Sequence, residues 1–343
     1  MFTESPHGYK DIPPPIILVT GATGAVGPNV VRELLTAGYQ IRTLSLDLPQ
    51  KGIWPDDVGV CIGDVADPAI VLSAMRGVAA VIHLAALLHI VNPPDFLREQ
   101  YRKINVGGTK VVVDTAMKLN IRRILLFSTI AVYGETNGQI ISEETPPHPD
   151  TFYGQTKLEA EQIVLTAKNA IGEPIGTVLR LAAVYGSRIK GNYRQLLMAL
   201  EHRWFLPIGQ GRNRRTLIYD KDVANAAVLA LQHPAAGRVY NVSDGRYHTL
   251  DEIIGAMCHA LGRKPPYFSV PVAPIRCIAG ILEDAAGMAG FKSPIVRSTI
   301  DKYTEDVAVD SRLIQKELGF ITKFNLANGW QDMVQEMRRA GSL

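Results

Sequence analysis

A run of apolar, β-branched residues near the start of the chain stops at three evenly spaced glycines. Residues 16–20 have the composition of a buried strand, and Gly21, Gly24 and Gly27 follow them. Such a strand-to-helix turn is typical of a phosphate-binding loop. We expect Gly21 to permit the tight turn, Gly24 to admit a pyrophosphate, and Gly27 to let the helix pack closely. An ordinary glycine-rich turn is the alternative. The helix that follows presents one apolar face, made of Val26, Val30, Val31, Leu34 and Leu35.

Strand patterns and helical patterns alternate over the first half of the chain, which predicts a doubly wound parallel sheet, a Rossmann fold of the α/β class. A later strand at 238–242 could return to the same sheet. Ligands of such sheets bind outside the carboxyl ends of the strands. The strands expected after the first lie at 41–46, 58–62, 80–86, 124–129 and 175–181.

The alternation becomes irregular after residue 182, so a second domain built from separate segments is expected. We predict that residues 16–182 and about 216–245 form the NAD(P)-binding domain. A smaller, discontinuous substrate-binding domain then comprises about 183–215 and 246–340.

Composition narrows the classes of protein further. Apolar residues make up 47% of the 343 residues, and the net charge of +3 is too mild to favour nucleic acid or an anionic membrane. The apolar stretch at 79–91 is too short to span a bilayer. The three cysteines form no CxxC pair, which fits a reducing compartment. The acidic, proline-rich start does not resemble a signal peptide. We therefore expect a cytoplasmic protein without a membrane, nucleic-acid or metal partner.

The residues after the second and third strands bear on the cofactor. A ribose-binding acid is expected about 20 residues beyond the glycines, where Ser45 and then Asp47 occur. Arg42 is nearby, but no arginine stands where a 2′-phosphate would need one, so NAD is favoured and NADP stays open. Asp64 ends the third strand and could accept from an adenine amino group or cap the next helix. His83 lies inside an apolar strand, where a hydrogen-bonded core histidine is expected.

A Tyr-x-x-x-Lys pair supplies the chemistry. Tyr153 and Lys157 are one helical turn apart and follow a strand that ends in Ser128 and Thr129. The lysine ammonium, together with the positive nicotinamide ring of a bound cofactor, would lower the phenol's pKa, so that it can exchange protons near neutrality. Thr129 could hold a substrate oxygen in line. For an isolated YxxxK pair, the alternative is a solvated helix face.

As a set, these residues resemble the extended short-chain dehydrogenase/reductase family, the NAD-dependent epimerase/dehydratase group. The resemblance covers about residues 16–340, with the motifs in the family's order and spacing. Those motifs are Thr20–Gly27, Gly63-Asp64, His83–Ala86, Asn105–Thr109, Ser128-Thr129 with Val132–Gly134, and Tyr153–Lys157.

The resemblance implies Tyr153 as acid/base, Lys157 as its electrostatic partner and ribose anchor, and Thr129 as holder of the substrate oxygen. Asn105 would support the lysine through a hydrogen bond or a water. The implied cofactor site comprises Gly21, Thr23, Gly24, Ala25, Val26, Gly27, Ser45, Asp47, Asp64, Val65, Leu84, Ala85, Ala86, Asn105, Ser128, Tyr153 and Lys157.

The second half implies a nucleotide-sugar substrate. Arg215 falls on the family's diphosphate-binding arginine, whose planar fork suits phosphate. Asn192 matches a position that contacts the sugar diphosphate. Arg212 and Arg214 are expected to be solvated charges, and Asp310 to cap the helix near the C-terminus.

Departures from the family pattern narrow the reaction. The sugar dehydratases carry Asp-Glu after the threonine, where this chain has Ile130 and Ala131. Many 4-epimerases have an asparagine where this chain has Ala183. The resemblance favours hydride transfer at C4 of a UDP-linked hexose, by a 4-epimerase or a 4-ketoreductase.

Two other functions stay open. One is a 3β-hydroxysteroid-dehydrogenase-like or aldehyde-reductase-like enzyme, with no productive role for Arg215. The other is a non-catalytic NAD(P)-sensing protein. The family also implies a homodimer through the helices that carry Val111, Val112, Ile163 and Val164; burial against the chain's own sheet is the alternative.

Overall fold

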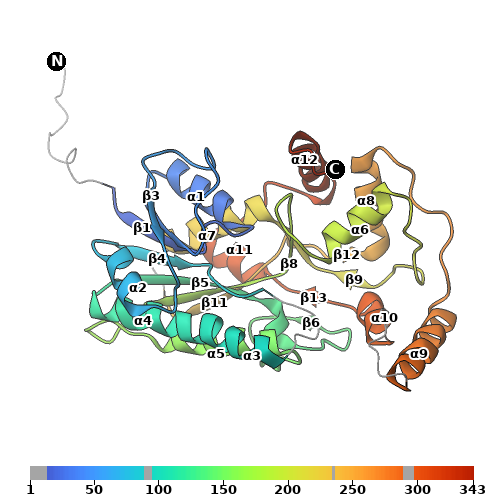
Figure 1. Cartoon of the computed structure of the whole chain (residues 1–343), viewed down its shortest axis with the longest axis horizontal. Helices are drawn as coiled ribbons and strands as arrows, with labels where there is room; N and C mark the ends of the chain where they lie inside the picture. Colours follow the sequence, from blue (N-terminus) through green and yellow to red (C-terminus); the bar gives the residue numbers. More distant parts are fainter. Residues whose placement is uncertain (1–13, 89–94, 234–235, 289–296) are drawn as a thin grey trace, which may run out of the picture.

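The computed structural model describes residues 14–88, 95–233, 236–288 and 297–343. Its centre is a seven-stranded parallel sheet, as the sequence predicts (Figure 1). The strand at the far edge is the predicted returning strand, which pairs with β7. In spatial order the strands are β11 (Arg238–Val242), β7 (Gly176–Leu181), β5 (Arg123–Thr129), β4 (Ala80–His83), β1 (Ile16–Thr20), β2 (Gln40–Ser45) and β3 (Gly59–Ile62).

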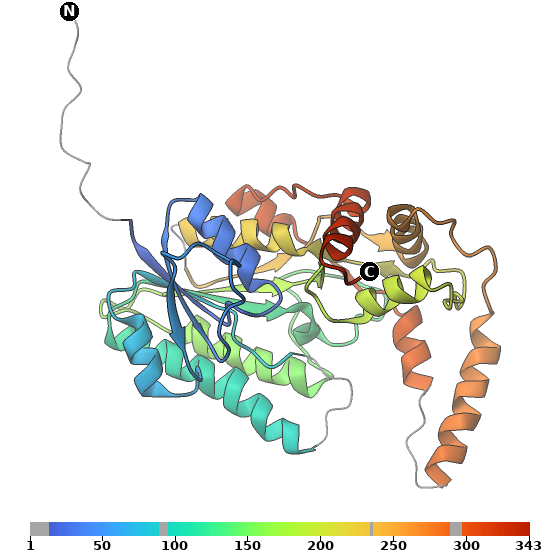
Figure 2. The same ribbon diagram turned by 45° about the horizontal axis from the view of Figure 1, so that its top comes forward.

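Helices cover both faces of the sheet, and alternate residues of each strand point into separate cores (Figure 2). In β1, for example, Ile17 and Val19 pack on one side and Leu18 on the other. One layer contains α1 (Gly27–Thr36), α7 (Asp220–Gln232) and α11 (Arg312–Leu318). The opposite layer contains α2 (Pro68–Met75), α4 (Thr109–Lys118) and α5 (Phe152–Thr166).

The helical stretch before α4 is not α-helical throughout. After α3 (Asp95–Tyr101), residues Arg102–Gly108 form a π-helix before the chain continues into α4. π-Helical turns are rare and frequent at functional sites. This one carries Asn105, which is buried.

The chain's own core accounts for the apolar residues that the sequence assigns to a dimer contact. Val112 and Val164 are fully buried against the sheet. Val111 and Ile163 are half-buried and pack on the same core.

A second group of elements lies beyond the carboxyl ends of the strands, with its own core. Trp330 is fully buried there and stacks on Tyr185 at 4.4 Å between ring centroids. Most of these helices are not predicted by the pattern of the sequence. The group contains β8 (Ala183–Tyr185), α6 (Asn192–Glu201), β9 (Arg214–Arg215), β10 (Leu217–Tyr219), β12 (His248–Thr249), α8 (Leu250–Leu261) and α12 (Leu326–Arg339).

Three further pieces complete the described chain. A short strand, β6 (Ile140–Ile141), pairs with β13 (Ala308–Val309). Helices α9 (Val272–Met288) and α10 (Arg297–Thr304) stand at the edge of the molecule (Figures 1 and 2). No helix among the described residues is long and apolar enough to cross a membrane.

The glycine turn tests the packing argument directly. A Cβ at Gly27 would lie 2.1 Å from the backbone oxygen of Ala22, so Gly27→Ala must push the start of α1 off the turn. We expect this overpacking to cost about 1–3 kcal/mol in the free energy of unfolding. Urea unfolding followed by circular dichroism measures it.

Gly255 in α8 is the matched control, because a Cβ there meets nothing within 4 Å. Gly255→Ala should stabilise the protein by up to about 1 kcal/mol through helix propensity. Equal effects of the two substitutions would contradict the packing argument.

Candidate functional site

The turn between β1 and α1 has the geometry of a phosphate cradle. Gly21 adopts φ +69°, and a Cβ on it would lie 2.7 Å from the backbone nitrogen of Ala85. The start of α1 makes no side-chain capping bond, so no cap competes there with an anion for the first N–H groups of the helix. The turn therefore brings the β1 loop and the residues after β4 together, at the switch point of the sheet order between β1 and β4.

Ser45 supports this turn from the neighbouring strand. Its hydroxyl accepts a hydrogen bond from the backbone N–H of Thr23 at 3.2 Å. Asp47 is exposed just beyond it. Arg42 turns away and donates to the carbonyls of Ala74 and Arg76. The nearest arginine is thus already engaged, which agrees with the preference for NAD over a 2′-phosphorylated cofactor.

Asp64 does not cap the following helix. That role belongs to Asp67, which accepts from the first N–H groups of α2. Asp64 instead accepts from the N–H of Ala66 and lies 3.5 Å from the Lys103 ammonium. The cap alternative is therefore wrong, and the position at the end of β3 stays consistent with an adenine contact.

His83 is a hydrogen-bonded core histidine, as predicted. Its ring lies 2.7 Å from the Thr20 hydroxyl and 3.1 Å from that of Thr109. Burial, reinforced by the charge of Lys157, lowers its pKa to about 3, so the ring is neutral at physiological pH.

Asn105 organises the floor of the site. Its amide accepts from the backbone N–H of Leu87 and donates to the Thr156 hydroxyl at 3.1 Å. Thr156 in turn donates to the carbonyl of Tyr153. The asparagine therefore holds the first turn of α5 through Thr156; its support of Lys157 through a hydrogen bond or a water stays a prediction.

Tyr153 and Lys157 lie on one face of α5, and the solvated-face alternative is wrong for the lysine. Lys157 is 3% exposed, and burial lowers its pKa to about 8 while Glu161 opposes the shift. Burial raises the pKa of the Tyr153 phenol, and nearby Tyr101 adds to the rise. Without the cofactor, burial therefore sets the pKa of the phenol; its lowering by Lys157 together with a bound nicotinamide ring stays a prediction.

A close backbone approach holds the helix start against the end of β5. A Cβ at Gly154 would lie 2.7 Å from the carbonyl oxygen of Ala131, two residues after Thr129. Thr129 caps the 3-10 turn Ile130–Tyr133 by accepting from the Ala131 N–H. The small residue inside the Tyr-x-x-x-Lys motif thus places Tyr153 beside the strand end that carries Thr129.

A buried ion pair that the sequence analysis missed ties the same strand to the same helix. Glu161 is four residues after Lys157 and bonds the Arg180 guanidinium at 2.6 Å, both side chains being almost completely buried. Ser128 donates to the other oxygen of Glu161 at 2.5 Å. The Ser128 hydroxyl therefore points at α5. In the sequence, Glu161 stands one helical turn after Lys157, and this spacing is the signal that could have indicated its role.

The predicted substrate residues lie in the second group of elements. Arg215 donates from its guanidinium to the carbonyls of Lys302 and Tyr303. Arg214 is not a solvated charge: it pairs with Asp306 at 2.8 Å and also donates to the Gly138 carbonyl. Arg212 is exposed, as predicted. Asp310 accepts from the Arg312 N–H at the first residue of α11, while Ser311 holds the N-cap position.

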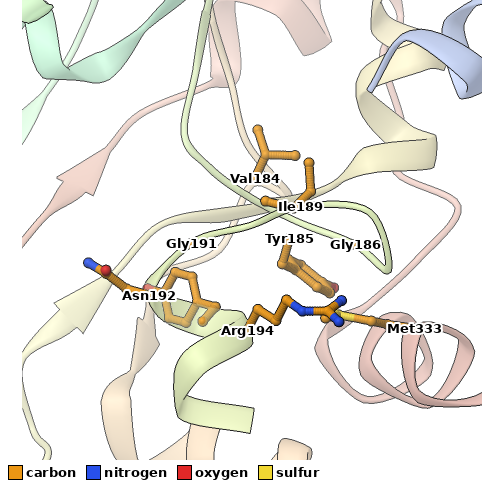
Figure 3. Close-up of a pocket in the computed structure, with 9 residues that line it drawn as sticks. Val184, Tyr185, Gly186, Ile189, Gly191, Asn192, Arg194 and Met333 are labelled. Carbon is orange, nitrogen blue, oxygen red and sulfur yellow. The ribbon is translucent and has the colours of Figure 1, made fainter. Parts of the chain in front are cut away.

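Asn192 lines a small cavity of about 30 Å³ between β8, α6 and α12 (Figure 3). Its amide lies on the far side of the lining from Met333, with Tyr185 and Arg194 between them. Burial raises the pKa of the neighbouring Tyr193 to about 12. The volume suits a water molecule and is far below the several hundred Å³ typical of a ligand pocket.

Comparisons with known proteins agree with this geometry. The sequence model of the NAD dependent epimerase/dehydratase family matches residues 17–243. A UDP-glucose 4-epimerase of Vibrio cholerae is 29% identical over 336 residues, covering 96% of this chain and 97% of that protein.

A second relative is an N-acetyl-alpha-D-glucosaminyl-diphospho-ditrans,octacis-undecaprenol 4-epimerase of Escherichia coli O157:H7. It is 27% identical over 322 residues, covering 93% of this chain and 94% of that protein. Among solved structures, a UDP-glucose 4-epimerase of Thermotoga maritima with UDP-glucose has a TM-score of 0.74 at 22% identity. That match covers 95% of this chain and 99% of the other.

The ion pair yields a stability prediction. Glu161→Gln leaves the buried Arg180 guanidinium without a counter-charge, which should reduce the free energy of unfolding by about 3–5 kcal/mol. Denaturant unfolding measures it. Glu159→Gln is the control, because that exposed carboxylate lies 3.8 Å from Arg102 and should change stability by less than about 0.5 kcal/mol. A loss for Glu161→Gln as small as the control's would contradict the role of the pair.

Asp220 yields a pH prediction. It is 1% exposed and packs against Gly186, and burial together with Glu336 raises its pKa from 3.8 to about 7. The unfolded chain ionises this group first, so the folded state loses stability as pH rises from about 4 to 7. Asp220→Asn should remove that loss. The free energy of unfolding of the variant should therefore exceed that of the parent by on the order of 1–4 kcal/mol at pH 8 and by almost nothing near pH 4.

Thermal unfolding across this pH range measures the effect. Asp251→Asn on the exposed first turn of α8 is the control and should show no such pH-dependent gain. A gain for Asp220→Asn that is equal at both pH values would rule out the assigned titration.

Proposed function

The chain belongs to the NAD-dependent epimerase/dehydratase family and is an NAD-dependent enzyme of that group, and we propose that it transfers hydride at C4 of a UDP-linked hexose. One observation carries the proposal. Tyr153 and the buried Lys157 lie one turn apart on α5, held by Gly154 against the end of β5. The two curated relatives support the position on the sugar, since both are named as 4-epimerases of diphosphate-linked sugars.

The residues present fit NAD. The glycine turn and the open start of α1 would hold the pyrophosphate. Asp47 would take the ribose and Asp64 the adenine. After Leu84 at the end of β4, the small side chains of Ala85 and Ala86 would leave room for a flat ring, with Asn105 beneath them. When bound, NAD supplies the acceptor and donor of hydride.

Each catalytic side chain then has one task. Thr129 would hold the substrate oxygen in line. The phenol oxygen of Tyr153 would take the proton from that substrate oxygen or return it. The raised pKa keeps Tyr153 protonated, which suits it as an acid. Lys157 would stabilise the phenolate when the tyrosine acts as a base and would anchor the ribose. Its pKa of about 8 keeps it mostly charged at neutral pH.

The residues after Thr129 disfavour dehydration. Eliminating water needs an acid and a base beside the substrate, and Ile130 and Ala131 can supply neither. A 4-epimerase and a 4-ketoreductase both use the same tyrosine and lysine. In a 4-epimerase the hydride returns to the other face of the same sugar, so the cofactor is unchanged at the end. In a 4-ketoreductase the hydride is delivered once, and the oxidised cofactor must be exchanged.

We further propose a division of labour between the two halves. The cofactor would bind residues 16–182 and about 216–245, and the substrate would bind about 183–215 and 246–340. Arg215 and Asn192 would meet the diphosphate, with Arg215 leaving its carbonyl partners to do so. A cytoplasmic homodimer stays a prediction of the sequence.

Turnover assays test the reaction. The protein is incubated with UDP-hexoses and with UDP-4-keto sugars, with and without NADH or NADPH. Interconversion without net cofactor use indicates an epimerase, and stoichiometric cofactor oxidation a reductase. Turnover of a 3β-hydroxysteroid or an aldehyde, with none of any nucleotide sugar, would overturn the proposal.

The tyrosine variant tests the mechanism. Tyr153→Phe removes the proton-transfer group and should lower kcat by about 10²–10⁴-fold with little change in NAD affinity. Tyr39→Phe, placed before β2 at the opposite edge of the sheet, is the control and should keep full activity. Undiminished turnover by Tyr153→Phe would favour the non-catalytic, NAD(P)-sensing alternative.

A further inference from the structure

Four large apolar side chains stand in solvent beyond the second core. Trp204 is 83% exposed, Tyr267 81%, Phe268 82% and Leu206 53%. We call these four residues the aromatic edge. Scattered exposed leucines are common on protein surfaces, but a group of exposed aromatic side chains marks an interaction site.

The two segments that carry the aromatic edge run side by side. Val270 donates through its backbone N–H to the Pro207 carbonyl at 2.9 Å. Gly209 donates to the Val270 carbonyl at 2.8 Å. The segment after α6 and the segment after α8 are thus joined by backbone hydrogen bonds, which brings the aromatic side chains onto one border of the molecule.

The apolar surface continues along the chain into α9. Ile278, Ile281 and Leu282 are exposed at helical spacing, while Ala279 and Gly280 between them are buried. Figures 1 and 2 show α9 standing out from the body, with α10 beside it. Ion pairs join the two helices, from Arg276 to Asp301 and from Arg297 to Asp284.

Exposed cations flank the aromatic edge, while other arginines of the two segments are paired with acids: Arg263 with Glu201, Arg276 with Asp301 and Arg214 with Asp306. Residues 202–219 contain four arginines, and residues 262–282 contain two arginines and a lysine; neither segment has an acidic residue. Arg203 and Lys264, next to the aromatic edge in sequence, are exposed. Amphipathic surfaces with aromatic and basic residues bind the interface of membranes that contain anionic lipids.

We propose that the aromatic edge and the exposed face of α9 dock on the surface of a membrane rich in anionic lipid. The apolar side chains enter the interfacial layer, and Arg203 and Lys264 meet the headgroups. A second copy of this chain fits the surface less well, because it would bring the same positive charges together. The proposal departs from the expectation of no membrane partner, which rests on the net charge of the whole chain. The proposal is independent of the reaction catalysed.

Vesicle flotation of the full chain tests the docking. We expect binding to phosphatidylcholine vesicles that contain about 30% phosphatidylglycerol, and much weaker binding to phosphatidylcholine alone. Binding should fall as salt rises from about 0.1 to about 0.5 M, because the headgroup attraction is screened. Trp204→Ser with Phe268→Ser should reduce the bound fraction by about tenfold.

The control replaces two apolar residues away from the aromatic edge. Ile171 and Ile321 are each 78% exposed, and Ile171→Ser with Ile321→Ser should leave flotation unchanged. Unaltered thermal unfolding of both double variants confirms that they fold. Flotation that is absent, or equally lost in both double variants, overturns the proposal. Sedimentation without lipid adds one further outcome: a dimer that only Trp204→Ser with Phe268→Ser dissociates would identify the surface as a contact between copies and overturn membrane docking.

Discussion

The carboxylate of Glu161 is the point on which the geometry of the candidate site depends. It accepts from Ser128 on β5 and pairs with Arg180 on β7, while its own backbone belongs to α5. Two strands and a helix are therefore fixed to one another by charge-assisted hydrogen bonds in a place that excludes water. Desolvation makes such a pair costly to form, so its value lies in directing geometry more than in adding stability.

The network extends beyond these three elements. The Arg180 guanidinium lies 4.7 Å from the centre of the Tyr133 ring, and the Tyr133 hydroxyl donates to Asn241 on β11. The 3-10 turn after Thr129 is thereby tied to the last strand of the sheet. Thr129 sits between two fixed points, Ser128 before it and Tyr133 after it. A side chain that holds a substrate oxygen needs such support, because a displacement of about 1 Å can slow a catalysed reaction by about 10²-fold.

Sequence reasoning recovers the sheet because its signals are local and repeated. Each strand is a short apolar run that ends at a small or polar residue, and the glycines at 21 and 27 meet requirements that the structure confirms. It fails where the outcome depends on distant partners. Arg214 reads as a surface charge until Asp306, far along the chain, comes beside it. The π-helix around Asn105 leaves no mark in the apolar period. Helix α8 was readable, since Thr249 and Glu252 form a capping box and Gly262 ends it.

The pKa of Tyr153 shows a second limit to what can be predicted from the sequence. A motif places an ammonium near a phenol and suggests a lowered pKa, whereas the fold buries both groups and raises that of the phenol. Which effect prevails depends on how much water the fold removes, and residue spacing does not encode that quantity.

The same reasoning applies to charge on the outside of the molecule. A net charge of +3 describes the sum over the chain, whereas a binding surface responds to the charges within about a Debye length of it, roughly 10 Å. Exposed cations such as Arg203 and Lys264 can therefore attract an anionic surface that the total charge would not.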